Sequence, residues 1–154
     1  MIPIAQLHPI IVHFPIVFFI TLAVFDTVAV ARGYEIFGQT VTGNISTALA
    51  VLSGLAAIIA YMFGDLAFDA AISSGVADVT LETHEAFGTT TAILFAVWAI
   101  VRGYVWWRGT RIEGNRKSAA IAIEIAGVLL IVTTAYFGGQ LVYDLGVNVS
   151  RMTG

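Results

Sequence analysis

Four long apolar stretches constrain this chain more than any other feature of its sequence. They run from about Pro9 to Ala31, Asn44 to Phe63, Glu82 to Trp107 and Ser118 to Leu141. A helix needs roughly 20 apolar residues to cross the hydrocarbon core of a bilayer. Because lipid offers no partner for a free backbone N–H or C=O group, all four stretches must be helical. The sequence therefore predicts an all-α, polytopic membrane four-helix bundle.

Composition narrows the class of protein further. Only 11% of the 154 residues are charged, whereas a soluble domain has about a quarter. The chain has no cysteine, which excludes disulfides, thiolate metal sites, iron–sulfur clusters and c-type haem. A net charge of -3, with few basic residues, argues against nucleic-acid binding. No basic residue precedes the first apolar run, so we expect this run to stay as a helix rather than be cleaved as a signal.

The basic residues predict the orientation. Six of the seven lie in or beside the first and third connections: Arg32, Arg102, Arg108, Arg111, Arg116 and Lys117. By the positive-inside rule these connections face the cytoplasm, so both termini are external. We expect a multi-pass protein of the bacterial cytoplasmic (inner) membrane. The three histidines, His8, His13 and His84, then all lie near the external face, and Pro15 is expected to kink the first helix.

Residues 1–154 form one predicted domain made of two similar hairpins, about 8–75 and 79–149. At an offset of about 71 residues, Arg32-Gly33-Tyr34 matches Arg102-Gly103-Tyr104, and His13 matches His84. The matched halves share one topology, which predicts a repeat axis along the membrane normal. This register leaves His8 without a counterpart, because Val79 stands at its position.

The paired histidines predict a cofactor site. Two imidazoles facing each other across a four-helix bundle suit the axial ligation of one b-type haem, here by His13 and His84. Gly88, one turn after His84, would leave room for a flat macrocycle, and Tyr61 and Tyr136 would pack against it. His8 would contact a propionate or a quinol.

Other interpretations of the histidines stay open. His13 and His84, with His8 and nearby carboxylates such as Asp65 or Glu85, would suit zinc, copper or iron. However, His8 and His13 are five residues apart, which places them about 140° apart around an ideal helix. Both could join the same metal site only if the first helical turn is distorted. The histidines also suit a plain water-facing interface. No hydrolytic triad or phosphate-binding loop occurs in the sequence, so we assign no catalytic residue.

Three charged residues fall inside the apolar stretches near the cytoplasmic end: Asp26, Arg102 and Glu124. Ionisable residues within a membrane span usually pair with one another or mark a proton path. We expect Arg102 to pair with the two carboxylates in a structural network, with a proton path as the alternative. Two small residues four apart, Ala50 and Gly54, predict close helix packing.

The segments Leu7–Ile16 (LHPIIVHFPI) and Gly138–Tyr143 (GGQLVY) resemble the bacterial membrane-protein family labelled domain of unknown function 2231. The resemblance spans most of the chain and implies a four-helix inner-membrane protein, without a mechanism. The bundle also resembles small four-helix b-type cytochromes in its inward-facing histidines, although three histidines are too few for two bis-histidine haems.

Our hypothesis is electron transfer through one haem, between a quinol and an external electron carrier. The alternatives are a non-catalytic structural subunit of a larger membrane complex or homo-oligomer, and a histidine-based metal-binding or transport module.

Overall fold

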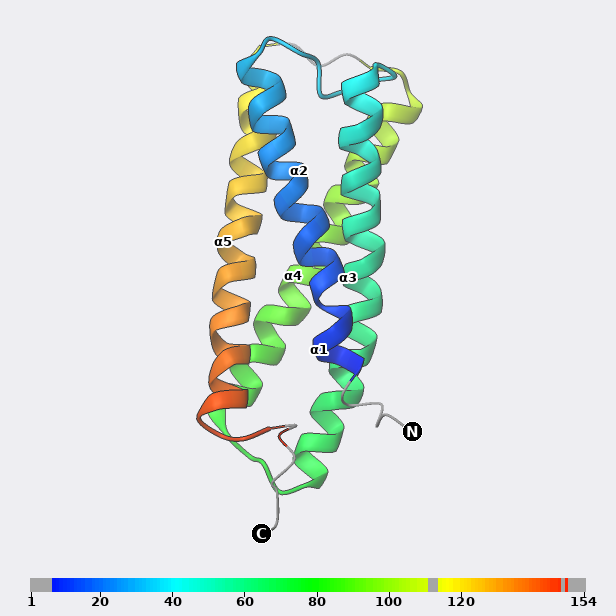
Figure 1. Cartoon of the computed structure of the whole chain (residues 1–154). Helices are drawn as coiled ribbons and strands as arrows, with labels where there is room; N and C mark the ends of the chain where they lie inside the picture. The colour runs from blue at the N-terminus through cyan, green and yellow to red at the C-terminus, as the bar shows by residue number, and fades with distance from the viewer. Residues whose placement is uncertain (1–6, 111–113, 148, 150–154) are drawn as a thin grey trace.

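The computed structural model describes residues 7–110, 114–147 and 149, and it is helical throughout these ranges apart from short connections (Figure 1). The helices are α1 (Leu7–Ile11), α2 (His13–Ala31), α3 (Val41–Ser73), α4 (Val79–Trp107) and α5 (Asn115–Tyr143). No strand occurs among the described residues. The all-α prediction is confirmed.

Four helical segments are long and apolar enough to cross a membrane: 7–31, 41–73, 79–107 and 115–143. Large apolar side chains point outward along them, for example Val17, Leu55, Ile100 and Leu129. In water this surface would be costly, whereas lipid solvates it. The chain is therefore built to span a bilayer four times.

The helices pack in the cyclic order α2, α3, α4, α5, so α2 lies opposite α4 and α3 opposite α5. The α3–α4 seam is the most extensive and the α2–α5 seam the least. The start of α1, the loop 74–78 and the end of α5 lie together at one end, which we call the histidine end (Figure 1). The loop 32–40, residues 108–110 and residue 114 lie at the other, which we call the arginine end.

The first span is interrupted where Pro15 predicts a kink. Residue Val12 separates α1 from α2, and Pro15 is buried. A proline has no N–H to donate to the carbonyl four residues earlier, here that of Ile11, which breaks the helical ladder at this turn. Val12 keeps helical backbone angles, so α1 and α2 form one span with a local break.

Helices α3, α4 and α5 all extend beyond the predicted limits, and α4 begins at Val79, three residues before Glu82. α3 continues ten residues past Phe63 to Ser73, and α5 begins at Asn115 and ends at Tyr143. The extra turns of α3 carry Asp65 and Asp69, both exposed. Charged residues end an apolar run in the sequence, but they do not end a helix that emerges from the membrane into water.

The core lies at mid-height, where Phe19 of α2 stacks on Phe95 of α4 with ring centroids 3.7 Å apart and planes 7° apart. Small residues allow this contact. A Cβ added at Gly127 would lie 2.4 Å from the Phe19 ring, and one added at Gly54 would lie 2.5 Å from Ala99 Cβ. The close approach predicted from Ala50 and Gly54, both buried, is present between α3 and α4.

The contacts relate α2 to α4 at an offset of 76 residues rather than 71. Phe19 stacks on Phe95, and both helices end in an Arg-Gly pair, Arg32-Gly33 and Arg108-Gly109. The two ends are closed by the same three backbone hydrogen bonds, and both glycines have a positive φ, of 80° and 61°. The register predicted from Arg32 and Arg102 is wrong, because Arg32 is exposed at a helix end and Arg102 is buried inside α4. The half boundaries, 8–75 and 79–149, stay a prediction.

Candidate cofactor site

The histidine end brings the rings of His8 and His84 close together inside the bundle, in an edge-on arrangement. Their ring centroids are 6.3 Å apart and the ring planes are 76° apart. His8 Nδ1 lies 3.1 Å from the carbonyl oxygen of Ala60 in α3, and His84 Nδ1 lies 3.0 Å from that of Thr134 in α5. Helices α1 and α4 thus carry the two rings, and α3 and α5 provide the carbonyl groups that hold them.

The hydrogen bonds fix the tautomer of both rings. A carbonyl oxygen only accepts, so Nδ1 must carry the hydrogen in His8 and in His84. In a neutral imidazole the other nitrogen, Nε2, then holds a lone pair. Among the described residues neither Nε2 has a hydrogen-bond partner. The arrangement therefore offers two lone pairs on neighbouring rings.

A glycine supports each ring. A Cβ added at Gly64 would lie 3.0 Å from His8 Cε1, and one added at Gly138 would lie 3.0 Å from His84 Cε1. Gly64 and Gly138 are 74 residues apart, as are Ala60 and Thr134. The two imidazoles therefore lie in matched environments. Each contacts a glycine and a main-chain carbonyl group of one helix, α3 for His8 and α5 for His84.

The rings line a cavity of ≈ 530 Å³ that reaches from the histidine end down to Phe95 and Ile131. Most of its lining is apolar, and the polar groups are mainly histidines, threonines and acidic residues near the mouth. This volume lies in the range of about 300–1,000 Å³ that is usual for small-molecule and cofactor sites.

His13 is placed differently from His8 and His84. It also belongs to the cavity lining, but it is exposed at the start of α2 and makes no ring contact with His84. The structure thus gives His8, not His13, as the counterpart of His84, and the predicted absence of a partner for His8 is wrong. The cause is the register: 76 residues separate His8 from His84, and 71 separate His13 from it.

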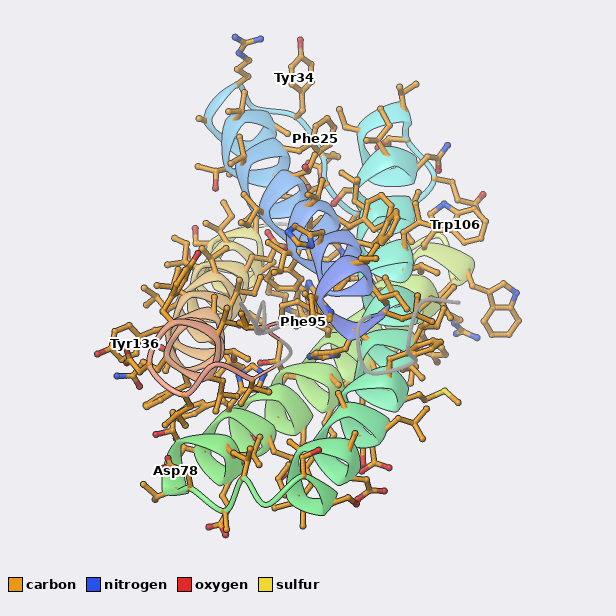
Figure 2. All side chains as sticks on the ribbon, turned by 60° about the horizontal axis from the view of Figure 1, so that its bottom comes forward. Phe25, Tyr34, Asp78, Phe95, Trp106 and Tyr136 are labelled. Atoms are coloured by element: carbon orange, nitrogen blue, oxygen red, sulfur yellow. The ribbon has the colours of Figure 1, made fainter. Side chains whose placement is uncertain are left out.

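Two of the other predicted site residues line the cavity, and one does not. Gly88 and Tyr61 belong to its lining, and a Cβ added at Gly88 would meet no atom of the described residues within 4 Å. Tyr136 is 63% exposed and points away from the bundle, where its hydroxyl accepts a hydrogen bond from Gln140 (Figure 2). The structure therefore does not place Tyr136 against a cofactor in this cavity.

The carboxylates do not join the imidazoles. No group of three or more His, Asp or Glu side chains with metal-binding geometry occurs in the described part of the chain. Glu85 follows His84 and lines the cavity, but its Oε1 accepts a hydrogen bond of 3.0 Å from Thr89. The site is therefore a two-imidazole site.

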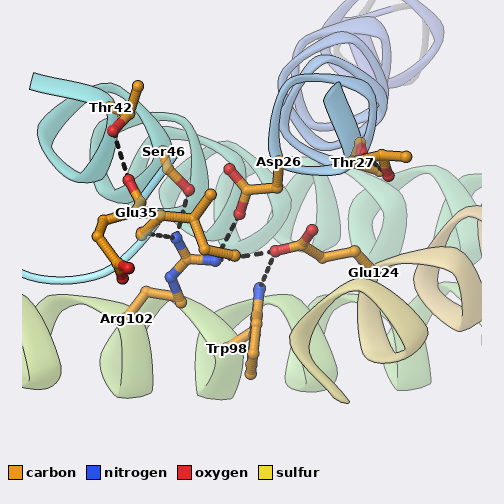
Figure 3. A network of polar contacts seen from close by, with 10 residues as sticks. Asp26, Thr27, Glu35, Thr42, Ser46, Trp98, Arg102 and Glu124 are labelled. Atoms are coloured by element: carbon orange, nitrogen blue, oxygen red, sulfur yellow. Dashed lines mark hydrogen bonds and ion pairs between the residues drawn. The ribbon is translucent and has the colours of Figure 1, made fainter. Parts of the chain in front are cut away.

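The arginine end holds the second polar cluster, around Arg102 (Figure 3). Arg102 Nη1 donates to Asp26 Oδ2 at 2.8 Å and to Glu124 Oε1 at 2.9 Å. Its Nη2 donates to the carbonyl oxygen of Ile36 at 2.8 Å and to the hydroxyl of Ser46. All three charged side chains are fully buried. The predicted pairing of Arg102 with Asp26 and Glu124 is confirmed.

Aromatic residues enclose the guanidinium. Its central carbon lies 4.6 Å from the Phe37 ring centroid and 5.6 Å from that of Trp98. Trp98 Nε1 also donates to Glu124 Oε1 at 3.3 Å. Phe37 comes from the loop 32–40, which closes over this end. An arginine held by aromatic faces and four hydrogen-bond acceptors is fixed in one position.

Sequence reasoning missed the glycines and carbonyls that hold the imidazoles. The signal was present as an offset of 76 that pairs His8, Phe19 and the Arg32-Gly33 cap with His84, Phe95 and the Arg108-Gly109 cap. Between α3 and α5 the offset is 74 residues instead of 76, and this offset pairs Gly64 with Gly138.

The comparisons with known proteins agree with this architecture. No curated protein and no solved structure matches the chain. The model of one family, described as predicted membrane protein (DUF2231), matches residues 5–151, nearly the whole chain. The two motifs that carry the resemblance, 7–16 and 138–143, lie at the histidine end and include His8 and Gly138. The chain therefore belongs to the DUF2231 family of predicted membrane proteins.

Proposed function

We propose that this chain is a small membrane cytochrome that holds one b-type haem between His8 and His84 and transfers electrons at the histidine end. The observation that carries the proposal is the pair of imidazoles, with ring centroids 6.3 Å apart, in a mostly apolar cavity of ≈ 530 Å³. We propose His8 as the second ligand in place of His13, because the ring of His8 lies beside His84 and His13 is exposed.

The ring separation matches what one metal ion requires. With the ligating nitrogen about 1.15 Å from the ring centre and about 2.0 Å from the metal, two imidazoles on opposite sides of an ion have centres roughly 6.3 Å apart. Rotation of a ring about its metal–nitrogen bond does not change this distance. The angle of 76° between the planes is therefore compatible with shared ligation.

The tautomer also fits ligation. A metal-bound histidine generally donates its second ring N–H to a carbonyl or carboxylate, which orients the ring and raises its basicity. His8 and His84 both do this through Nδ1, toward Ala60 and Thr134. Neither Nε2 can donate to the other, so a Lewis acid held between the rings would accept both lone pairs.

Haem fits two protein ligands better than a bare ion does. A porphyrin supplies four nitrogens, so two imidazoles complete the iron, whereas zinc prefers four protein ligands and finds only two here. The apolar lining and Gly88 at the cavity wall leave space for a flat, apolar ring. His13, an exposed residue in the lining of the same cavity, would give a polar contact toward water. Arg151, the one basic residue expected at this end, lies outside the described residues.

Ligation from both sides favours electron transfer. Haem supplies a one-electron iron couple when bound. His8 and His84 would together hold the haem, and it would then carry an electron rather than bind oxygen or a substrate. The chain's own contribution would be to fix both rings and exclude water with its apolar walls. A quinol or an external electron carrier stays the proposed partner, reached at the histidine end.

The test is an absorption spectrum of the detergent-purified protein after haem addition, oxidised and then reduced with dithionite. We expect a Soret band with sharp α and β bands on reduction. His8→Ala and His84→Ala should abolish this spectrum, and His13→Ala, the matched control, should keep it. Because an alanine variant can fail to fold, His8→Met is the second test. It should retain haem with a raised reduction potential, since methionine is an axial ligand that raises it.

Each other result has a defined meaning. Loss of haem in His13→Ala, but not in His8→Ala, would return the ligand role to His13. A wild-type protein that takes up no haem would overturn the cytochrome proposal. The same spacing suits a single two-coordinate copper ion, so elemental analysis of that protein would then test the metal-binding candidate. An empty result would leave a structural subunit.

A further inference from the structure

The Arg102 cluster contains more negative than positive charge. Asp26 from α2 and Glu124 from α5 both accept from the same atom, Arg102 Nη1, at 2.8 and 2.9 Å. The nearest polar groups from the other elements are neutral: Ser46 of α3, Trp98 of α4 and the carbonyl of Ile36. In the described residues Lys117 pairs with Glu35 instead, so it does not neutralise this cluster. Two carboxylates therefore share one cation.

Each carboxylate also has an oxygen without a partner. Asp26 Oδ1 and Glu124 Oε2 are buried and make no hydrogen bond to any described residue. The two terminal nitrogens of Arg102 already donate twice each, and its Nε–H makes no hydrogen bond to either oxygen or to any other described residue. An unpartnered carboxylate oxygen in a dry site is costly, and two ionised carboxylates near one another are more costly still. A bound proton would relieve both costs.

We infer that Asp26 and Glu124 bind one proton between them, which makes the arginine end a proton-binding site. One carboxylate stays ionised against Arg102, the other becomes a carboxylic acid, and the cluster as a whole is neutral. Protonation places a hydrogen on one carboxylate oxygen. The resulting O–H group can donate a hydrogen bond, and the neighbouring ionised carboxylate can accept it. The proton is taken up as H⁺ from water at the arginine end, and no other group changes its bonding.

This site is separate from the imidazole site. Along both α2 and α4 the stacked rings of Phe19 and Phe95 lie between the histidines and the charged cluster. The loop residues Ile36 and Phe37 are buried and close the cluster from water. The inference therefore goes beyond the cytochrome proposal and stands or falls independently of haem.

The test is infrared spectroscopy of the wild-type chain in an ester-free detergent at neutral pH, without added haem. We expect the C=O stretch of one protonated carboxylic acid per chain, shifted in heavy water and lost at high pH. Exposed carboxylates are ionised at neutral pH and do not contribute. Asp26→Asn and Glu124→Gln should each remove the band, because the remaining carboxylate is then ionised against Arg102. Asp69→Asn, at an exposed position of α3, is the control and should leave the band unchanged.

Thermal denaturation separates this inference from a misfolded variant. Each single amide variant should stay folded, because it leaves one carboxylate for one guanidinium. The double variant leaves Arg102 buried without a counter-ion, and its midpoint should fall by roughly 10 °C or more. Absence of the carboxylic-acid band in the wild-type protein would overturn the inference. Survival of the band in either folded single variant would overturn the sharing of the proton.

Discussion

The two ends of the bundle use related positions in opposite ways. At the histidine end, positions 76 residues apart carry the same residue, His8 and His84, with ring centroids 6.3 Å apart. At the arginine end, positions with the same relation carry Asp26 and Arg102, which form an ion pair at 2.8 Å. One fold repeat thus supports an identical pair at one end and a complementary pair at the other.

Identical and complementary pairs have different chemical needs. Two imidazoles with the same tautomer present two lone pairs, and neither ring can donate to the other. Asp26 and Arg102 satisfy each other directly, and aromatic rings cover the guanidinium. The identical pair lines a cavity of ≈ 530 Å³, whereas the complementary pair is fully buried. The comparison indicates a ligand site at the histidine end and a self-contained cluster at the arginine end.

The largest effect should come from breaking the complementary pair. Arg102→Leu leaves Asp26 and Glu124 buried without their cation, and loss of one partner from a buried ion pair costs about 3–5 kcal/mol. Denaturation of the detergent-solubilised protein would measure the free energy of unfolding. Arg32→Leu, at an exposed helix end, is the control and should stay within about 0.5 kcal/mol of wild type. Equal stability of the two variants would contradict the view that Arg102 holds this end together.

A smaller effect, on haem affinity, should come from displacing the imidazoles of His8 and His84. In Gly64→Ala and Gly138→Ala the new methyl group lies 3.0 Å from an imidazole carbon, so the ring must shift. Disturbed support of a metal ligand typically lowers affinity about tenfold or more, and the two variants should lose haem affinity to a similar degree. Gly103→Ala is the control, because Gly103 does not line the cavity and its methyl group would meet only Val51 Cγ2, at 3.9 Å. Haem titration followed at the Soret band would measure this, and a loss in only one variant would contradict equivalent roles for His8 and His84.

The four spans and the Arg102 cluster could be predicted because their physical signals are strong. A run of about 20 apolar residues has few other structures open to it, and a charge inside such a run needs a partner at the same depth. Asp26, Arg102 and Glu124 were therefore predicted to meet, and they do. The prediction of the spans and the prediction of the Arg102 cluster both depend on how far along a span a residue lies, and the sequence gives this directly.

The histidine pairing could not be predicted because it depends on register between helices. A shift of five residues replaces His8 with His13, and an Arg-Gly pair occurs at both 102–103 and 108–109. Only the structure shows that Arg108-Gly109 ends its helix as Arg32-Gly33 does, whereas Arg102 is buried. The glycines behind the rings were equally hidden, since glycine is common in membrane helices and only contact gives Gly64 and Gly138 a role.

The smallest expected effect concerns how the histidine end presents His84. Asp78 caps α4, six residues before His84, and its Oδ1 accepts from the N–H of Thr80 at 2.7 Å. Hydrogen bonds from the Thr80 side chain and then from its N–H lower the pKa of Asp78 below its ordinary value of 3.8. A carboxyl group with a lowered folded-state pKa stabilises the fold above its unfolded value and loses this contribution as the pH falls through the folded value.

We therefore expect stability to fall slightly as the pH drops below about 4, and Asp78→Ala to lack this part of the pH dependence. Asp78→Asn keeps an acceptor without a titrating group, so it should keep most of the cap at every pH. Denaturation midpoints of the three proteins across acidic pH would measure the difference. A midpoint for Asp78→Ala equal to that of wild type at neutral pH would mean that the start of α4 is held by packing alone. The alignment of His84 would then depend on Gly138 and Thr134, not on its own helix cap.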